Sequence, residues 1–413
     1  MKFLHAADIH LDSPLTGLER YEGAPIHTIR NATRHAFDNL IELALNEQIA
    51  FLLLAGDLYD GDWRDYNTGL YFNDRMNRLR DAGIKVFIVA GNHDAASQIT
   101  KHLRLPDNVT LFSTKQPERK ILDTYDTAIH GQGFATRAVT NDLSQAYPQG
   151  DPYLFNIGLL HTSLDGKPGH EPYAPCHIDG LRSKGYHYWA LGHIHQREVI
   201  SQAPWILYPG NLQGRHIREQ GAKGCTLVTV KAGEIIDVCH HDLDQIRWSQ
   251  CDLKVATNAT IDDLYDQINS ALQQQAASAD GRPLALRLVL HGTCHAHAEL
   301  QTHHEQWIQE YRALASSISG AEIWLERVQL KTAPQRQSID HDPTITDLLN
   351  AIDHLQPDET TFDRINSELT ALRQKLPAEL LSGTDPFDPT DPKRLATTLT
   401  EIKEIIRYQL LKL

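Results

Sequence analysis

One short pattern, repeated five times, constrains this chain more than any other feature of its sequence. In each repeat a run of apolar residues, typical of a buried strand, ends directly in Asp, Asn or His. The clearest example is the run at residues 86–90, which is followed by Gly91 and then by Asn92, His93 and Asp94. Open α/β sheets bind their ligands beyond the carboxyl ends of the strands. A single junction of this kind is weak evidence for a functional site.

Four further junctions repeat the construction. Their apolar runs lie at residues 2–7, 51–55, 157–160 and 188–191, and they end in Asp8-Ile9-His10, Gly56-Asp57-Leu58-Tyr59-Asp60, His161 and Gly192-His193-Ile194-His195. Three of the five junctions pass through glycine, which tolerates the backbone angles of a sharp exit from a sheet. Five strand ends that each deliver such a side chain indicate one shared site.

Length and composition bound the class of protein. A chain of 413 residues is too long for one typical core, so we expect two or three domains. The 41% hydrophobic and 22% charged residues are typical of globular proteins. The sequence has no apolar run of 18 residues and no signal-peptide pattern at its start. Because its five cysteines show no C-x-x-C spacing, we expect reduced thiols in a cytoplasmic protein.

The net charge of −14 argues against a protein that grips DNA through its overall field. Phosphate neutralisation supplies most of the non-specific affinity for DNA, and an acidic chain repels the phosphates. Such a chain either does not bind nucleic acid or binds it through metal ions, local basic patches or a partner. Arg215 and Arg218 are basic candidates near the expected site, and the alternative is that both are solvated surface charges.

The first half of the chain predicts an α/β fold. Helical spacing of apolar residues at 28–48 and 67–82 places two helices between the first three strands, an order that favours parallel strands buried between helices. Short alternating runs between residues 108 and 134 predict a second, more antiparallel sheet, in which His130 is structural. We also expect a strand at 205–208 and a hairpin of residues 224–230 and 234–240 that turns at 231–233.

A second structural unit is predicted to begin near residue 252. Strands at 253–256, 284–290 and 322–330 alternate with helices at 261–275 and 298–316, which predicts a small β-α-β-α-β unit. Nearby Cys and His residues match no zinc spacing, and we interpret them as a solvated helix start; they are Cys294, His295, His297, His303 and His304. We therefore expect a catalytic domain over residues 1–250, a cap domain over 251–333 and a linker with helical tail over 334–413.

The tail ends in an amphipathic helix behind a polar linker at 334–342 and a Pro/Asp-rich stretch at 385–392. Its apolar stripe, interrupted by Gln409, consists of Leu395, Leu399, Ile402, Ile406 and Leu413. The stripe packs either on its own domain or on a partner helix. We favour the partner, because a helix behind such a spacer has little core of its own.

The polar residues at the five junctions predict a centre of two metal ions. The candidate ligands are Asp8, His10, Asp57, Asn92, His161, His193 and His195. Seven ligands are too many for one catalytic ion that keeps open positions, whereas they suit two ions that share a carboxylate. Asp57 is the expected bridge; Asp8, His10 and His195 complete one site, and Asn92, His161 and His193 the other. Mixed imidazole and oxygen ligation favours Mn²⁺, with Fe or Zn as alternatives.

The charges of such a centre balance around a phosphodiester. Two divalent cations and two aspartates leave +2, which a bridging hydroxide and one phosphodiester neutralise. The hydroxide is the expected nucleophile. His93, beside a ligand without being one, is the candidate donor to the leaving oxygen. Either Asp60 or Asp94 orients its imidazole, and the sequence does not separate the two.

The ordered blocks D-x-H, G-D-x-x-D, G-N-H-D, H and G-H-x-H, all present between residues 1 and 195, resemble the calcineurin-like metallophosphoesterase superfamily. Within it, the stretch 8–15, the turn Tyr208-Pro209-Gly210-Asn211 and the small cap resemble DNA double-strand-break repair nucleases, in the branch of SbcD-like, YhaO-type bacterial exonucleases. One departure is Gly61, where the phosphoprotein-phosphatase branch has Arg, which weighs against phosphatase activity of that kind. The tail after residue 334 resembles the family only in general character.

The resemblance implies a four-layer α-β-β-α catalytic domain, Mn²⁺ dependence, 3′-to-5′ exonuclease and endonuclease activity, and often a dimer. It also implies a partner ATPase of the SbcC type, whose coiled coils receive the C-terminal helices. The family's metal ligands fall on the seven residues named above, and its phosphate-contacting histidine falls on His93.

Three functions follow from these observations. The leading hypothesis is a two-metal DNA nuclease in DNA repair, because a cap beside the site can position a duplex. The second is a phosphodiesterase or phosphatase for a small phosphorylated substrate, which uses the same centre. The third is a non-catalytic scaffold subunit of an ATPase complex, and the complete ligand set together with His93 argues against it.

Overall fold

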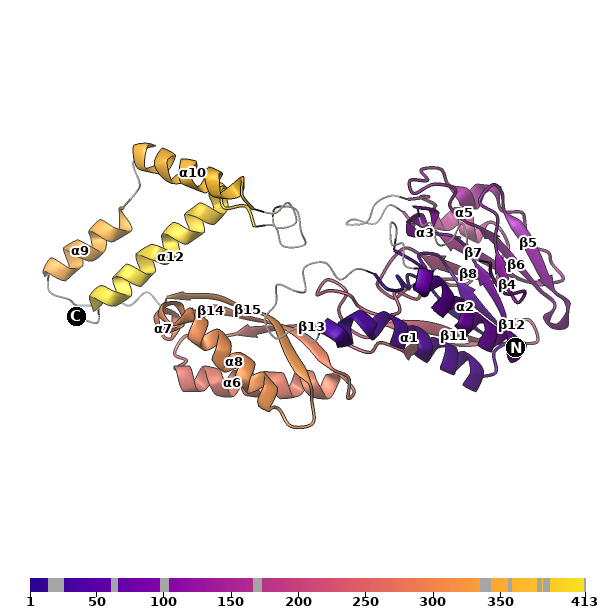
Figure 1. The fold of residues 1–413 in the computed structure, drawn as a ribbon, viewed down its shortest axis with the longest axis horizontal. Helices are drawn as coiled ribbons and strands as arrows, with labels where there is room; N and C mark the ends of the chain where they lie inside the picture. The colour runs from indigo at the N-terminus through magenta and orange to yellow at the C-terminus, as the bar shows by residue number, and fades with distance from the viewer. Residues whose placement is uncertain are drawn as a thin grey trace. The chain divides into compact units, whose positions relative to one another are not determined.

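Two six-stranded sheets packed face to face form the core of the N-terminal part of the protein. The computed structural model describes residues 1–13, 26–60, 66–96, 104–165, 173–334, 343–355, 359–376, 381 and 387–411. The chain divides into two units, residues 1–249 with 282–285 and residues 250–281 with 286–413. Figure 1 shows the sheets and helices of both units.

The first sheet has the order β12-β11-β1-β2-β3-β4. Its strands are β1 (Lys2–Ala6), β2 (Phe51–Leu54), β3 (Lys85–Ile88), β4 (Val109–Leu111), β11 (Gly224–Lys231) and β12 (Glu234–Asp242). Strands β1 to β4 are parallel, while β11 runs antiparallel to β1 and to β12. The predicted hairpin is confirmed: β11 and β12 turn at Ala232 and Gly233, both of which have the positive φ of a two-residue hairpin turn.

The second sheet has the order β5-β6-β7-β8-β10-β9. Its strands are β5 (Glu118–Leu122), β6 (Thr127–Gln132), β7 (Phe155–His161), β8 (Tyr188–Gly192), β9 (Glu198–Gln202) and β10 (Trp205–Tyr208). The prediction of a more antiparallel sheet from residues 108–134 holds only in part. Strands β5 and β6 are antiparallel, but β4 lies parallel to β3 in the first sheet, and β6, β7, β8 and β10 are parallel. The predicted region is therefore divided between the two sheets, and β5 is an edge strand with mostly exposed side chains.

Both faces of the central strands of each sheet are buried, which explains why these strands are continuous apolar runs rather than alternating ones. Alternate residues of β1 show the division: Phe3 packs between the sheets, whereas Leu4 packs against the outer helices. Helices α1 (Ile26–Asn46) and α2 (Tyr66–Asp81) cover the first sheet (Figure 1). The outer face of the second sheet packs beneath the short helix α5 (Ile178–Arg182) and neighbouring loops. The unit is therefore a four-layer α-β-β-α sandwich.

The second unit contains a three-stranded sheet of order β13-β14-β15. Its strands are β13 (Arg247–Lys254), β14 (Leu284–Cys294) and β15 (Ile323–Pro334), with helices α6 (Ile261–Ser278), α7 (His297–Thr302) and α8 (His304–Ser317). Thr260 and Asp263 start α6 with reciprocal side-chain to backbone hydrogen bonds. The helix predicted at 298–316 is two helices, because the non-helical backbone of His303 separates α7 from α8.

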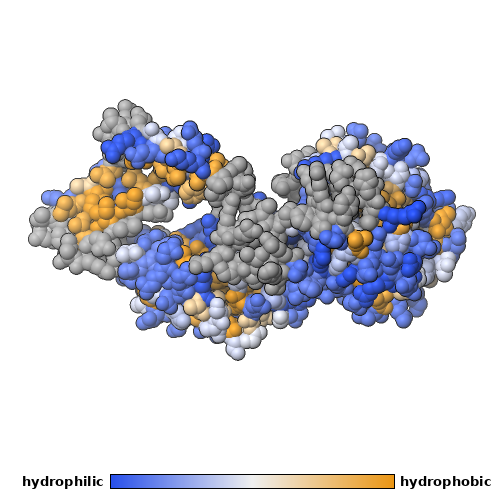
Figure 2. Space-filling view, viewed as in Figure 1, coloured by the Kyte–Doolittle hydropathy of each residue, from blue (hydrophilic) through white to orange (hydrophobic). Residues whose placement is uncertain are grey.

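The described residues of the tail include α9 (Pro343–Asp353), α10 (Glu359–Arg373) and α12 (Pro392–Leu411). Arg407 of α12 pairs with Asp353 of α9 at 2.7 Å. Within the predicted stripe, Ile402 and Ile406 are 46% and 40% exposed. Figure 2 shows apolar surface on this part of the chain. Linker residues 335–342, residues 385–386 and Leu413 lie outside the described residues.

A search of the described helices for one long and apolar enough to cross a membrane finds none.

Candidate metal centre

The polar residues at the strand ends come from both sheets and meet at one edge of the sandwich. Asp8, Asp57 and Asn92 follow β1, β2 and β3, which are neighbours in the first sheet. His161 ends β7, and His193 follows β8, its neighbour in the second sheet. Because the parallel strands of the two sheets end at the same edge, side chains from distant parts of the sequence meet there.

Asp57 lies at the centre of the cluster. Its Oδ2 atom is 3.4 Å from Nε2 of His161 and 4.0 Å from Nε2 of His10. Its Oδ1 atom accepts a hydrogen bond of 2.9 Å from the backbone N–H of His93. One oxygen therefore faces the imidazoles on both sides, while the other is already engaged by the backbone.

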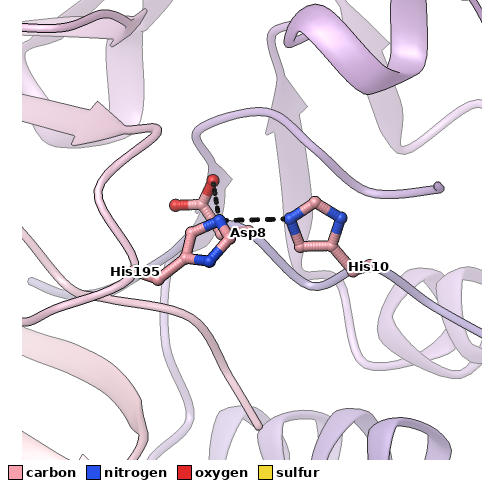
Figure 3. Close-up of side chains that lie close together, drawn as sticks. All are labelled: Asp8, His10 and His195. Carbon is pink, nitrogen blue, oxygen red and sulfur yellow. Dashed lines mark hydrogen bonds and ion pairs between the residues drawn. The ribbon is translucent and has the colours of Figure 1, made fainter. Parts of the chain in front are cut away.

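The remaining candidates surround this carboxylate in two groups. On one side, Nε2 of His195 lies 3.3 Å from Nε2 of His10 and 3.8 Å from Oδ1 of Asp8 (Figure 3). On the other side, Oδ1 of Asn92 lies 3.0 Å from Nε2 of His161, whose ring centroid is 5.2 Å from that of His193. The structure thus brings all seven predicted residues together.

Burial makes this cluster suitable for cations. Asp8 and Asp57 are both buried, and desolvation raises the pKa of each carboxyl, with the charge of Asp57 raising that of Asp8 further. Burial lowers the pKa of His161 to about 3 and also lowers that of His10, so both rings are neutral with free lone pairs. Buried carboxylates beside neutral imidazoles are a donor set suited to divalent metal ions.

Two imidazoles are fixed in the tautomer that metal binding requires. Nδ1 of His161 donates to the carbonyl oxygen of Ala55 at 2.9 Å, and Nδ1 of His195 donates to Oε1 of Glu219 at 2.7 Å. In both rings the proton is therefore on Nδ1, and the lone pair of Nε2 points toward the other candidate metal ligands. Such outer hydrogen bonds fix the tautomer and the orientation of metal-binding histidines.

Four of the seven residues have left-handed backbone conformations that side chains rarely adopt. The φ angles are 51° at Asp8, 45° at His10, 52° at Asp57 and 104° at His193. Each such residue costs on the order of 1–3 kcal/mol and persists only where surrounding contacts fix it. Here the backbone N–H of His193 donates to both carboxylate oxygens of Asp8 at 3.0 and 3.1 Å. Such strain is typical of functional sites.

At two of the junction glycines there is no room for a side chain. A Cβ atom at Gly91 would overlap the carboxylate of Asp57, and one at Gly192 would overlap the carbonyl oxygen of Ala55. Neither glycine has a positive φ, unlike Gly56, whose φ is 89°. The predicted need for backbone angles that favour glycine therefore holds at Gly56. At Gly91 and Gly192, the absence of a side chain instead allows the strand ends to approach each other.

The structure also decides which carboxylate orients His93. Nδ1 of His93 lies 2.7 Å from Oδ1 of Asp60. Asp94 instead accepts hydrogen bonds from the backbone N–H groups of Leu58, Tyr59 and Gly91, and so ties together the loops after β2 and β3. Burial alone would lower the pKa of His93, but the bond to Asp60 and the charge of Asp57 outweigh it and raise that pKa. The His93 side chain is 29% exposed, which leaves it accessible to a substrate.

Three residues that sequence reasoning did not assign contact the cluster from the segment after β10. Glu219 holds His195, Asn211 donates to Glu219 at 2.9 Å, and Lys223 donates to the carbonyl oxygen of His195 at 2.8 Å. No spacing in the sequence links these residues to the junctions. Arg215, one of the two basic candidates, is only 14% exposed and binds Glu219, so it is not a solvated surface charge.

Comparisons with known proteins agree with this geometry. The family model described as calcineurin-like phosphoesterase matches residues 1–197, and the model described as metallophosphoesterase YhaO, middle domain, matches residues 248–333. The chain is 35% identical over 297 residues to the uncharacterized metallophosphoesterase YhaO of Bacillus subtilis, which covers 71% of this chain and 72% of that protein.

More distant relatives carry names from DNA metabolism. The DNA double-strand break repair protein Mre11 of Sulfurisphaera tokodaii is 27% identical over 243 residues, 55% of this chain and 59% of its own length. The SbcD component of the nuclease SbcCD of Escherichia coli is 25% identical over 279 residues, 58% of this chain and 67% of its own length. Together with the match to YhaO, these similarities show that the chain belongs to the calcineurin-like metallophosphoesterase family, whose members are metal-dependent phosphoester hydrolases.

Proposed function

We propose that this protein is a two-metal DNA nuclease that hydrolyses phosphodiester bonds in DNA repair. The observation that carries the proposal is the position of Asp57, whose Oδ2 atom faces imidazoles of both halves of the cluster. In the proposed centre, Asp8, His10 and His195 would hold one cation, Asn92, His161 and His193 would hold the other, and Asp57 would contribute to both. The nuclease names of two relatives support DNA as the substrate.

The proposed mechanism assigns the acid to His93. When bound, two divalent cations, most suitably Mn²⁺, supply an activated water and offset the charge of the phosphate. Asp60 binds Nδ1 of His93 at 2.7 Å and thereby keeps a proton on that ring. In this proposal, Nε2 of His93 donates a proton to the leaving oxygen. The hydrogen bond from the His93 backbone to Asp57 fixes the position of His93 relative to a residue that would hold the cations.

We further propose a cytoplasmic homodimer in which residues 1–250 form the nuclease domain, residues 251–333 a cap that positions DNA, and residues 334–413 a region that binds an SbcC-like ATPase. The name of the Escherichia coli relative, one component of a larger nuclease, supports a partner. Exposed apolar residues on the tail helices, among them Leu348, Ile402 and Ile406, support the tail as its binding surface.

Substrate choice tests the nuclease proposal. The protein is stripped with a chelator, reloaded with Mn²⁺, and assayed on an end-labelled linear duplex and on a small chromogenic phosphodiester. We expect about two bound metal ions per chain by mass spectrometry, and turnover of the duplex far above that of the small ester. The opposite ranking would support the small-substrate phosphodiesterase instead. Metal binding without any turnover would support the scaffold function.

A further inference from the structure

Glu219 is bound so completely that its carboxylate has one available position. Its Oε1 atom accepts from Nδ1 of His195 at 2.7 Å and from Nη2 of Arg215 at 2.9 Å. Its Oε2 atom accepts from Nδ2 of Asn211 at 2.9 Å and from the backbone N–H of Arg215 at 2.8 Å. Because every partner is a donor, the carboxylate is fixed, and the imidazole that binds it is fixed in turn.

Arg215 connects this carboxylate with a second one, that of Asp60, which lies beside His10 and His93. Its Nη2 atom binds Glu219, and its Nη1 atom lies 3.5 Å from Oγ of Ser13 and 3.8 Å from Oδ2 of Asp60. Asp60 is the residue that binds Nδ1 of His93. One planar guanidinium therefore lies between the carboxylate that holds His195 and the carboxylate that holds His93.

Buried residues of both charges surround the proposed metal ligands. Arg215 forms ion pairs with the carboxylates of Asp60 and Glu219. Lys223 is only 3% exposed and donates to the carbonyl oxygen of His195 at 2.8 Å. Desolvation of a buried charge is costly unless an opposite charge accompanies it. The ion pairs of Arg215 and the backbone bond of Lys223 thus place fixed hydrogen-bonding groups around the cluster.

We propose that Arg215 and Glu219 are positioning residues, a bracket that holds His195 and His93 at a fixed separation. The inference rests on the proposed function, because it gives these histidines a shared task. Arg215 is mostly buried and its guanidinium faces two carboxylates, so in this proposal it acts within the protein rather than as a phosphate-binding residue. A lysine cannot replace it, because a single ammonium lacks the planar fork that reaches two carboxylates at once.

Metal affinity is the first test, measured by titration calorimetry of metal-free protein with Mn²⁺. Glu219→Gln turns an acceptor into an amide that faces donors, so His195 loses its fixed orientation. We expect Mn²⁺ affinity to fall about 10–100-fold, the usual effect of losing an outer partner of a metal-binding histidine. The matched control is Arg218→Ala, which changes an exposed side chain of the same loop and should bind Mn²⁺ like the wild type.

Steady-state kinetics on the DNA duplex is the second test, with Arg215→Lys as the variant. The bracket predicts a lower kcat and an unchanged KM, whereas a phosphate-binding arginine would give a higher KM. Asp60→Asn and Glu219→Gln should also show non-additive losses of kcat, because both act through Arg215. Thermal melts of each metal-free variant establish that it is folded.

The outcomes separate this inference from the function on which it rests. Failure of the wild-type protein to bind Mn²⁺ would overturn both. If the wild type binds Mn²⁺ and cleaves DNA, but Glu219→Gln binds it as tightly as Arg218→Ala, the bracket is wrong and the nuclease stands. A rise in KM alone for Arg215→Lys would likewise overturn the bracket.

Discussion

Individual side chains at this site are distinguished by what binds their second polar atom. His93 and His161 both lie next to Asp57, yet Nδ1 of His161 donates to a backbone carbonyl, whereas Nδ1 of His93 binds the carboxylate of Asp60. A neutral partner leaves an imidazole neutral, and an anionic partner favours a protonated ring. His161 is therefore suited to binding a cation, and His93 to donating a proton.

This difference predicts the result of His93→Ala. The variant should keep both metal ions, because the His93 side chain is not among the proposed donors, and it should lower kcat about 10²–10⁴-fold, as expected for loss of a general acid. Turnover of end-labelled duplex and metal content by mass spectrometry are the two measurements. Unchanged turnover would exclude His93 from the mechanism.

At the scale of secondary structure elements, the site depends on how closely the ends of strands from two sheets approach. Gly192 at the end of β8 lies against the carbonyl oxygen of Ala55 after β2 and near Nδ1 of His161. This contact brings the second sheet's histidines to the first sheet's carboxylates. A side chain at this position would separate the two sheets where the donors must meet.

Gly192→Ala is accordingly expected to lower the melting temperature and to weaken Mn²⁺ binding. Overpacking of this kind costs about 1–3 kcal/mol, and here it also displaces His161. Gly180→Ala is the matched control, since a Cβ atom there meets nothing within 4 Å and the residue lies in helix α5. That variant should be as stable as the wild type or more stable. Equal melting temperatures for the two variants would contradict the proposed role of Gly192.

The strand ends were predictable from the sequence because each is marked locally, by an apolar run and a polar successor. Glu219 and Arg215 were not, because they lie in an irregular segment whose path decides what they contact. The sequence left Asp60 and Asp94 as alternatives for the same reason. Both follow a junction, and only the conformation of the loops shows which of them contacts His93. The parallel order of the second sheet was also hidden, because its crossovers contain little helix for a periodic pattern to reveal.

At the scale of the whole molecule, two properties matter: the protein is acidic, and it buries several histidines in its interior. A net charge of −14 does not favour non-specific binding to DNA, so the proposed contact with DNA is concentrated at the metal centre. The interior also contains histidines outside that centre, including His5 and His130, which are both buried. The net charge bears on how DNA affinity depends on salt, and the buried histidines bear on how stability depends on pH.

The dependence of DNA affinity on salt should be shallow. Each phosphate neutralised by a lysine or arginine contributes about −0.9 to the slope of log affinity against log salt concentration for duplex DNA. A protein that contacts DNA mainly through its metal centre should have a slope of small magnitude. Fluorescence anisotropy with a labelled duplex, at several salt concentrations and fixed Mn²⁺, measures it. A steep slope would show that an extended basic surface binds the duplex.

Stability should fall as the pH decreases from about 6.5 toward 4. Burial lowers the pKa of His130 to about 4 and that of His5 to about 3, whereas unfolded histidine has a pKa of about 6.5. Over this interval the unfolded chain binds protons that the folded chain does not, so acid favours unfolding. Denaturant unfolding of the metal-free protein at several pH values tests this. His130→Phe should flatten the dependence, and an unchanged dependence would show that His130 does not contribute.

The two oxygens of Asp57 have different partners, which links the proposed acid to the proposed metal ligands. One oxygen of this carboxyl group holds the amide of His93, and the other faces the imidazoles of the proposed cation sites. The same carboxyl group would therefore couple the residues proposed to hold the cations to the backbone that carries the proposed acid. A displacement of Asp57 would displace the backbone of His93 as well.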